Sequence, residues 1–427
     1  MENVTTEKKT DKVTKILFIS MIVSIILAVA TVTLYVFLQG SRMFSDFAET
    51  LSYCLCGNPY TGESGIRSIY PPFAFLPFYL FALICKGPIQ SYIAEEINLT
   101  QLSHHPLFIL SFVLFYLIFM GLILLVSAKV SKFKGKKLAY LLVTIFCFGP
   151  CIYCFCRGNN IMSVALLVLM FFWLYNSEKR WARELGNLCL AGAIAIKIYP
   201  ALLLLFFLKD KRWLDMLKTL LYGVALILLP FLLIKGGFAN LKEIWNNFTT
   251  FNSGEGRQMD WTNIGFDSLA AKFTSLITLI TGLNTAMIYS ILSKILRFGS
   301  IIVTLVALIL SKNTKHKMQA VLITMLTYQL FQGVSYAYTL TMLIFPIIIY
   351  LIEFENLSKV NRYYYGICFA VVAVSIWASV GFFLIVQFAL VCMLIKGYID
   401  LFKDFMQRSK LKKEEKQQVV EKEKTSA

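Results

Sequence analysis

The run Ile16–Leu38, ILFISMIVSIILAVATVTLYVFL, contains no charged residue. A helix needs about 20 predominantly apolar residues to cross the hydrocarbon core of a bilayer. The run is longer than the apolar part of a cleavable signal peptide, and basic residues precede it (Lys8, Lys9, Lys12 and Lys15). We therefore predict that it forms a retained membrane-spanning helix.

The rest of the chain has the same apolar character. Of its 427 residues, 58% are hydrophobic and 15% are charged, whereas a soluble domain is about half apolar and a quarter charged. The net charge of +17 does not indicate nucleic acid binding, because the Lys and Arg residues lie in short loops between apolar runs. The sequence predicts an all-α integral membrane protein, a polytopic helical bundle with roughly 10–12 transmembrane helices.

Basic clusters predict the orientation, because they accumulate on the cytoplasmic side of a membrane. We expect a cytoplasmic N-terminal tail (1–15), a transmembrane domain (16–402) and a basic cytoplasmic C-terminal tail (403–427). Two long loops, 39–70 and 235–272, would then face the exterior of a cell membrane, which we expect to be a bacterial plasma membrane. Loops of this length are usually functional.

One segment does not fit this alternation. If Pro72–Cys85 and Leu107–Ala128 both crossed the membrane, the basic loop Lys129–Lys137 would face the exterior. Either Pro72–Cys85 is re-entrant or that loop is an exception to the positive-inside rule.

Two predicted hairpins turn at polar motifs on the exterior side. Lys197 lies between apolar stretches that are too short to be ordinary spans, and Pro200 follows it. A lysine near the bilayer centre costs about 2.5–3.5 kcal/mol, so it should face protein or water. It is either a snorkelling lysine at a helix end or a cation that binds an anion in an exterior cavity. The turn at Arg157, Asn159 and Asn160 is either an ordinary interfacial loop or part of the same site.

The first exterior loop carries two carboxylates. Ser45 is a candidate N-cap of a short interfacial helix, on which Asp46 and Glu49 would point the same way because they are three residues apart. They form either a solvated polar face or part of an active site. The loop ends at Tyr70-Pro71-Pro72, where proline can begin the next helix.

The second exterior loop mixes carboxylates, including Asp260, with aromatic residues. This mixture suits sugar or lipid headgroups, and it also suits a membrane-interface belt. Asn247-Phe248-Thr249 is a glycosylation sequon. The chain contains no metal-ligand or nucleotide-binding motif; we therefore expect no metal site and no cofactor, while participation of a divalent cation stays open.

In their order along the chain, these pieces resemble glycosyltransferase family 87, the polyprenyl-phosphate-mannose-dependent mannosyltransferases of the GT-C fold. The pieces that match are an aspartate after the first span, Tyr-Pro-Pro, Gly-Asn, Lys-x-x-Pro and Arg-Trp, which here are Asp46, Tyr70 to Pro72, Gly158-Asn159, Lys197 to Pro200 and Arg212-Trp213. The resemblance covers residues 16–235 well and the rest loosely. Many relatives have a histidine where this chain has Tyr338, which leaves the donor sugar open.

The resemblance implies an inverting transfer of a hexose, mannose in the family, from a polyprenyl-phosphate donor to a hydroxyl of a lipid or glycan acceptor on the exterior face. The lipid phosphate is already a good leaving group, so the reaction needs a base and a cation beside the phosphate. We assign Asp46 as the base and Lys197 as the phosphate partner. The further substrate-binding candidates are Arg157, Asn159, Tyr199, Tyr70, Glu49, Asp260 and Tyr338.

Two other classes are compatible with the sequence. One is a flippase or transporter of lipid-linked sugars, although such proteins often have broken helices in two related halves, and this chain has one clear broken pair. The other is a polysaccharide ligase-like assembly protein. Neither class needs a carboxylate directly after the first span, so the substitution Asp46→Asn separates them from a transferase.

Overall fold

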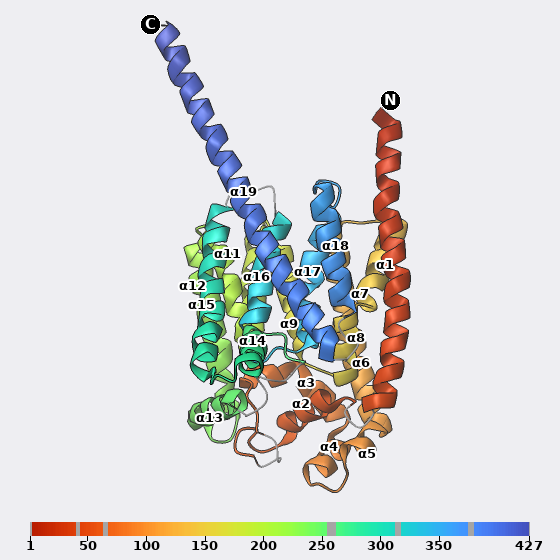
Figure 1. Cartoon of the computed structure of the whole chain (residues 1–427). Coiled ribbons are helices and arrows are strands. Elements are labelled where there is room, and N and C mark those ends of the chain that lie inside the picture. The colour runs from red at the N-terminus through yellow and green to blue at the C-terminus, as the bar shows by residue number, and fades with distance from the viewer. Residues whose placement is uncertain are drawn as a thin grey trace.

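The computed structural model of the chain is a bundle of helices (Figure 1). It describes residues 2–39, 43–62, 67–253, 262–311, 317–374 and 380–426, and these contain no β-strand. The α-helices are α1 (Glu2–Gln39), α2 (Ser45–Leu55), α3 (Leu76–Ile84), α4 (Lys86–Ile93), α5 (Leu99–Ser103), α6 (Pro106–Ser131), α7 (Gly135–Phe146), α8 (Gly149–Arg157), α9 (Ile161–Leu174), α10 (Arg180–Ile196), α11 (Leu205–Lys209), α12 (Trp213–Leu228), α13 (Asn240–Ser253), α14 (Phe266–Thr281), α15 (Ala286–Leu310), α16 (Lys317–Phe331), α17 (Ile344–Glu353), α18 (Lys359–Ala373) and α19 (Val380–Ser426). The 3-10 helices are η2 (Pro72–Phe75), η3 (Tyr199–Leu204), η4 (Leu229–Leu233), η5 (Gly237–Ala239) and η6 (Ala337–Leu343).

The prediction of an all-α polytopic membrane protein is confirmed. Among the described residues, five helices are long and apolar enough to cross a bilayer, or up to seven if each of two bent pairs is one span. The number expected from the sequence is larger because it also includes shorter apolar segments, such as α9. Most residues of α9 are buried. Such short helices can lie at membrane depth because neighbouring protein, rather than lipid, surrounds their ends.

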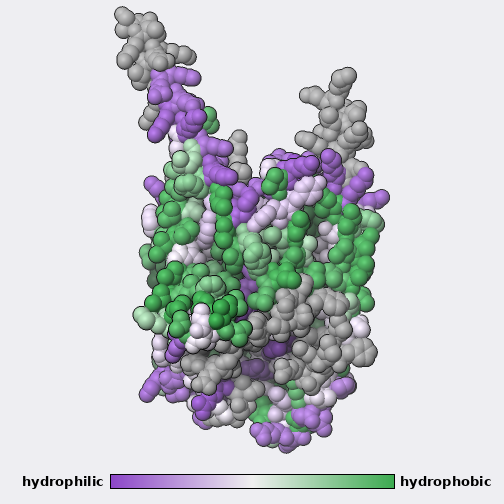
Figure 2. Space-filling view, in the orientation of Figure 1, coloured by the Kyte–Doolittle hydropathy of each residue, from purple (hydrophilic) through white to green (hydrophobic). Residues whose placement is uncertain are grey.

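The outer surface of the bundle is apolar at mid-height. Figure 2 shows hydrophobic side chains over the flank and hydrophilic ones towards the two ends. Large apolar side chains are widely exposed on this flank, for example Leu233 (90%), Leu279 (82%) and Phe388 (70%). A soluble monomer rarely exposes such continuous apolar surface, so lipid is the expected solvent of this band.

Both termini lie at the same end of the bundle, and α2, α4, α5 and α13 lie at the other (Figure 1). The pair α3 and α4 bends by 108°, as a broken span or a re-entrant loop would. A re-entrant pair here restores the alternation that Pro72–Cys85 disturbs in the sequence, so we favour that alternative of the two.

The predicted Arg-Trp loop at Arg212 has a structural role. The Arg212 guanidinium donates to the carbonyl oxygen of Tyr175 at 2.6 Å, pairs with Asp215 at 2.7 Å and lies over the Tyr175 ring at 4.4 Å. The Tyr175 hydroxyl in turn donates to Asp210 at 2.8 Å. These contacts hold the ends of α9, α11 and α12 together and thereby fix the hairpin that carries Lys197.

Buried asparagines join the two long loops. Asn58 Nδ2 donates to Lys235 O at 3.0 Å and to Asn240 Oδ1 at 2.9 Å. Asn247 Nδ2 donates to the carbonyl oxygens of Tyr60 and Ser68 at 3.0 and 3.1 Å. Asn247 is only 7% exposed, so the amide nitrogen of the sequon is committed to the fold and inaccessible to a modifying enzyme.

Candidate functional site

A strained residue at the start of α2 sets the position of Asp46. Phe44 has a left-handed backbone (φ 61°), and its N–H donates to Cys156 O at 2.9 Å. This bond ties the start of α2 to the end of α8. The predicted N-cap at Ser45 is wrong, because Phe44 occupies that position and no side chain caps the helix. Non-glycine residues with positive φ concentrate at functional sites.

Asp46 is bound by the turn between α8 and α9. Arg157 Nε donates to Asp46 Oδ2 at 2.9 Å and Arg157 Nη2 donates to Oδ1 at 2.5 Å. Asn159 Nδ2 adds a bond to Oδ2 at 2.7 Å, and Ser45 Oγ lies 3.3 Å from Oδ1. The structure thus brings together three of the residues predicted from the sequence. A bidentate guanidinium–carboxylate pair is strong and orients both groups.

Gly158 makes this close approach possible. It has a left-handed backbone (φ 68°), and a Cβ atom there would lie 2.4 Å from Phe47 Cβ. Only glycine meets both conditions without strain. Phe47 itself is fully buried and packs its ring against Phe112 at 5.3 Å. The Gly-Asn motif is therefore explained by packing as well as by the hydrogen bond of Asn159.

Lys197 lies at the broken end of α10 and is 8% exposed. Its Nζ faces the rings of Tyr70 and Tyr338, at 5.5 and 5.6 Å from their centroids. No residue in the described part of the chain forms a hydrogen bond or ion pair with this ammonium. Aromatic faces stabilise a cation by about 0.5–2 kcal/mol, but they do not replace a direct ion pair; Asp46, which is bound by Arg157, acts on the Lys197 charge only at longer range.

The two tyrosines come from different segments. Tyr70 precedes η2, and burial, with the carboxylates of Glu49 and Asp46 nearby, raises its pKa, so it stays a neutral phenol at pH 7. Tyr338 is in η6, and its ring lies 6.0 Å from that of Tyr153 on α8. A neutral ring presents its negative face to Lys197 without forming a salt bridge.

Of the other predicted site residues, the structure describes Glu49 and Tyr199. Glu49 accepts a hydrogen bond from the Tyr53 hydroxyl at 2.5 Å. Tyr199 begins η3, two residues after Lys197. Asp260 lies outside the described residues.

Asn263 was missed by the sequence reasoning, although it holds the segment that carries Tyr338. It is fully buried, and its Oδ1 accepts from Gly265 N at 2.9 Å and from Ser335 N at 3.0 Å. Its Nδ2 donates to Gly333 O at 2.9 Å. The signal in the sequence was weak, an Asn two residues before a Gly, which only indicates a turn.

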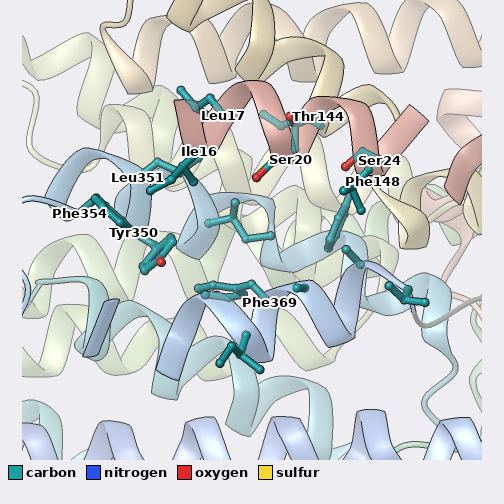
Figure 3. A pocket seen from close by; sticks show the side chains of 18 of the residues that line it. Ile16, Leu17, Ser20, Ser24, Thr144, Phe148, Tyr350, Leu351, Phe354 and Phe369 are labelled. Carbon is teal, nitrogen blue, oxygen red and sulfur yellow. The ribbon is translucent and has the colours of Figure 1, made fainter. Parts of the chain in front are cut away.

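An apolar cavity of about 390 Å³ opens on the flank between α1, α7, α17 and α18 (Figure 3). Leu17, Phe148 and Phe369 are among its lining residues. Ile344 also lines it and directly follows η6, which carries Tyr338. From Ile344 the lining extends along α17 to Phe354 and Arg362, and it includes none of the candidate site residues.

Comparison with known proteins identifies a family. No curated protein and no solved structure matches the chain. The model of glycosyltransferase family 87 matches residues 69–346, which is more than half of the chain and includes Arg157, Asn159, Lys197 and Tyr338. The chain therefore belongs to glycosyltransferase family 87 and is a multi-pass membrane glycosyltransferase.

Proposed function

We propose that this glycosyltransferase moves a hexose, mannose in the first instance, from a polyprenyl-phosphate donor to a hydroxyl of a lipid or glycan acceptor. The observation that carries the proposal is Lys197, a buried cation that faces two aromatic rings and forms no direct ion pair among the described residues. Burial of a lysine at membrane depth costs free energy, so we expect Lys197 to bind an anion from outside the chain.

The charges of the site match a lipid phosphate before and after transfer. Arg157 and Lys197 supply two positive charges, and Asp46 supplies one negative charge. A phosphodiester donor adds one negative charge, so these three side chains and the donor together are neutral; Glu49, whose carboxylate accepts from Tyr53, is not counted among them. After transfer the lipid phosphate carries up to two negative charges while Asp46 has become neutral, so the same groups together are neutral again. Two cations therefore balance the charge in both states.

The reaction is a single displacement. The acceptor oxygen forms a bond to the anomeric carbon, its proton passes to an oxygen of Asp46, and the bond between the anomeric carbon and the phosphate oxygen breaks with its electron pair on the phosphate. Attack opposite the leaving group inverts the anomeric configuration. Ser45 makes the longest contact to Asp46, at 3.3 Å, and is the group that an acceptor hydroxyl would replace. Lys197 stabilises the developing phosphate charge.

The apolar cavity supports a donor with a hydrocarbon chain. It lies in the apolar band, and its wall includes Ile344, one residue beyond the helix that carries Tyr338. An isoprenoid chain that leaves a phosphate at Lys197 would gain stability by burying its surface there, at about 25 cal/mol per Å². We propose that this cavity takes part of the donor chain.

The orientation follows from the basic tails. If both termini are cytoplasmic, the end of the bundle that carries α2 faces the exterior (Figure 1). We therefore place the reaction on the exterior face of a cell membrane, in bacteria the plasma membrane.

The direct test is a transfer assay with the purified protein. It uses a panel of polyprenyl-phosphate sugars, each of which carries a radiolabelled hexose. We expect transfer from at least one of these donors and, because two side-chain cations serve the phosphate, an unchanged rate in the presence of EDTA. Transfer from a nucleotide sugar alone would overturn the donor assignment, and loss of transfer in EDTA would overturn the assignment of Arg157 and Lys197 as sufficient counter-charges.

A further inference from the structure

Two buried polar side chains beside the site have unused hydrogen-bonding groups. Asn160 follows Asn159 in the turn and is only 2% exposed, yet neither its Nδ2 nor its Oδ1 has a partner in the described part of the chain. Ser163 is also 2% exposed, and its Oγ is likewise unpaired there. The two residues are three apart at the start of α9, so they lie on one face of the helix.

Among the described residues, Gln319 is the other buried amide side chain whose two polar groups are both unpaired. The buried asparagines Asn159, Asn247 and Asn263 all use their amide groups in hydrogen bonds. A buried polar group without a partner costs about 1–3 kcal/mol, and most such groups in native structures are satisfied. Asn160 carries two of these groups at once and directly follows Asn159, which binds Asp46, so its free groups are available to a partner bound at the candidate site.

The position of Asn160 indicates which partner. Asn159 Nδ2 donates to Asp46 Oδ2 at 2.7 Å, and on the preceding helix α8 the Tyr153 ring lies 6.0 Å from the ring of Tyr338, which faces Lys197. The turn therefore borders the space between the proposed base and the proposed phosphate partner. In a single displacement the sugar ring of the donor must occupy that space, because the acceptor oxygen, the anomeric carbon and the leaving oxygen lie in line.

We infer that Asn160, together with Ser163, forms the subsite for the donor sugar. The carboxamide offers a donor and an acceptor side by side, which suits two neighbouring ring hydroxyls of a hexose, and Ser163 Oγ suits a third polar group. The acceptor hydroxyl is excluded as the partner because its place is at Asp46. This inference rests on the proposed function and names the residues that select the sugar.

Thermal melting of the full-length protein in detergent tests the subsite without a turnover assay. The two ligands are a polyprenyl phosphate and the same lipid carrying the hexose. For the wild type, we expect the lipid that carries the hexose to raise the melting temperature more than the polyprenyl phosphate does. For Asn160→Ala, we expect both lipids to raise the melting temperature by the same amount. Asn160→Ala should melt no lower than the wild type without ligand, because the substitution removes two unpaired groups. Asn176→Ala is the matched control, since Asn176 is exposed at the far end of α9.

A second measurement uses donors that lack single hydroxyls. Removal of a donor hydroxyl that binds Asn160 should slow transfer by the wild type about tenfold. The same removal should not slow transfer by Asn160→Ala any further. Ser163→Ala should show the same pattern with a different hydroxyl. The inference is overturned if Asn160→Ala keeps the sugar-dependent stabilisation, or if it melts well below the wild type without ligand. If neither lipid stabilises the wild type, the proposed function fails and the subsite fails with it.

Discussion

Arg157 binds Asp46 through both Nε and Nη2, at 2.9 and 2.5 Å, although 111 residues separate the two in the chain. The pair exists because Phe44 N–H is bonded to Cys156 O directly before Arg157, which brings the start of α2 to the end of α8. A carboxylate held in this way has a fixed orientation before the acceptor arrives, and preorganisation of this kind lowers the barrier to reaction.

Asp46→Asn should reduce turnover by about 100- to 10,000-fold, because a general base typically contributes that much. The same change leaves Arg157 without its anion, so we also expect a lower melting temperature. Asp404→Asn is the matched control, since it breaks the Arg408–Asp404 pair within α19, away from the candidate site. Its turnover, measured per folded molecule, should stay near that of the wild type. Normal turnover in Asp46→Asn would remove Asp46 as the base and make Glu49 the next candidate.

The ring of Tyr338, rather than its hydroxyl, should matter for donor binding. Its centroid lies 5.6 Å from Lys197 Nζ, and a cation–π contact is worth about 0.5–2 kcal/mol. Tyr338→Phe should keep the KM for the donor, whereas Tyr338→Leu should raise it by about 2- to 30-fold. Steady-state kinetics with varied donor concentration distinguishes the two; equal effects of both substitutions would contradict a role for the ring face.

Asn247→Ala should destabilise the protein by about 1–3 kcal/mol, because it leaves the buried carbonyl oxygens of Tyr60 and Ser68 without their donor. Asn246→Ala is the control, since Asn246 directly precedes Asn247 and its side chain is exposed. The measurement is thermal unfolding in detergent. If the two substitutions have the same effect, Asn247 does not join the exterior loops.

Ala370→Trp should fill the apolar cavity that Ala370 lines between α1 and α18. We expect a higher KM for donors with long isoprenoid chains and little change for donors with the shortest chains, because only a long chain reaches the cavity. Ala139→Trp, on the exposed flank of α7 and outside this cavity, is the control. An equal rise in KM for all chain lengths in Ala370→Trp would show that the chain lies elsewhere.

The sequence predicted much of the fold because the bilayer imposes a strong hydropathy pattern. The span at Ile16–Leu38, the turn at Arg157 and the break at Lys197 all follow from apolar runs interrupted by charge or proline. The number of spans did not follow as well, because segments such as α9 are apolar but short, and hydropathy alone does not tell a buried short helix from a span.

The residues of the candidate site were named from the sequence, but the contacts among them were not. The spacing of Asp46 and Arg157 in the chain contains no information about their contact, which depends on the positive φ of Phe44 and on the space that Gly158 leaves beside Phe47. Asn263 was missed for the same reason, since its hydrogen bonds join segments about 70 residues apart.

The central claim is that the anionic partner of Lys197 is the donor phosphate rather than a protein carboxylate. Asp46 is bound by Arg157, and Glu255, a carboxylate of the second exterior loop, lies outside the described residues. A carboxylate partner would be left buried and uncompensated by Lys197→Met, and such a loss costs about 3–5 kcal/mol. A phosphate partner would leave the empty protein unharmed.

The most direct measurement is therefore thermal melting of Lys197→Met in detergent, with and without a polyprenyl phosphate, alongside the wild type and the control Lys242→Met, whose lysine is exposed on α13. We predict that Lys197→Met melts at or above the wild-type temperature without ligand and gains no stabilisation from the lipid, while Lys242→Met behaves as the wild type in both conditions. A mutant that melts far below the wild type without ligand, or that still gains the full stabilisation from the lipid, would contradict the assignment of Lys197 to the donor phosphate.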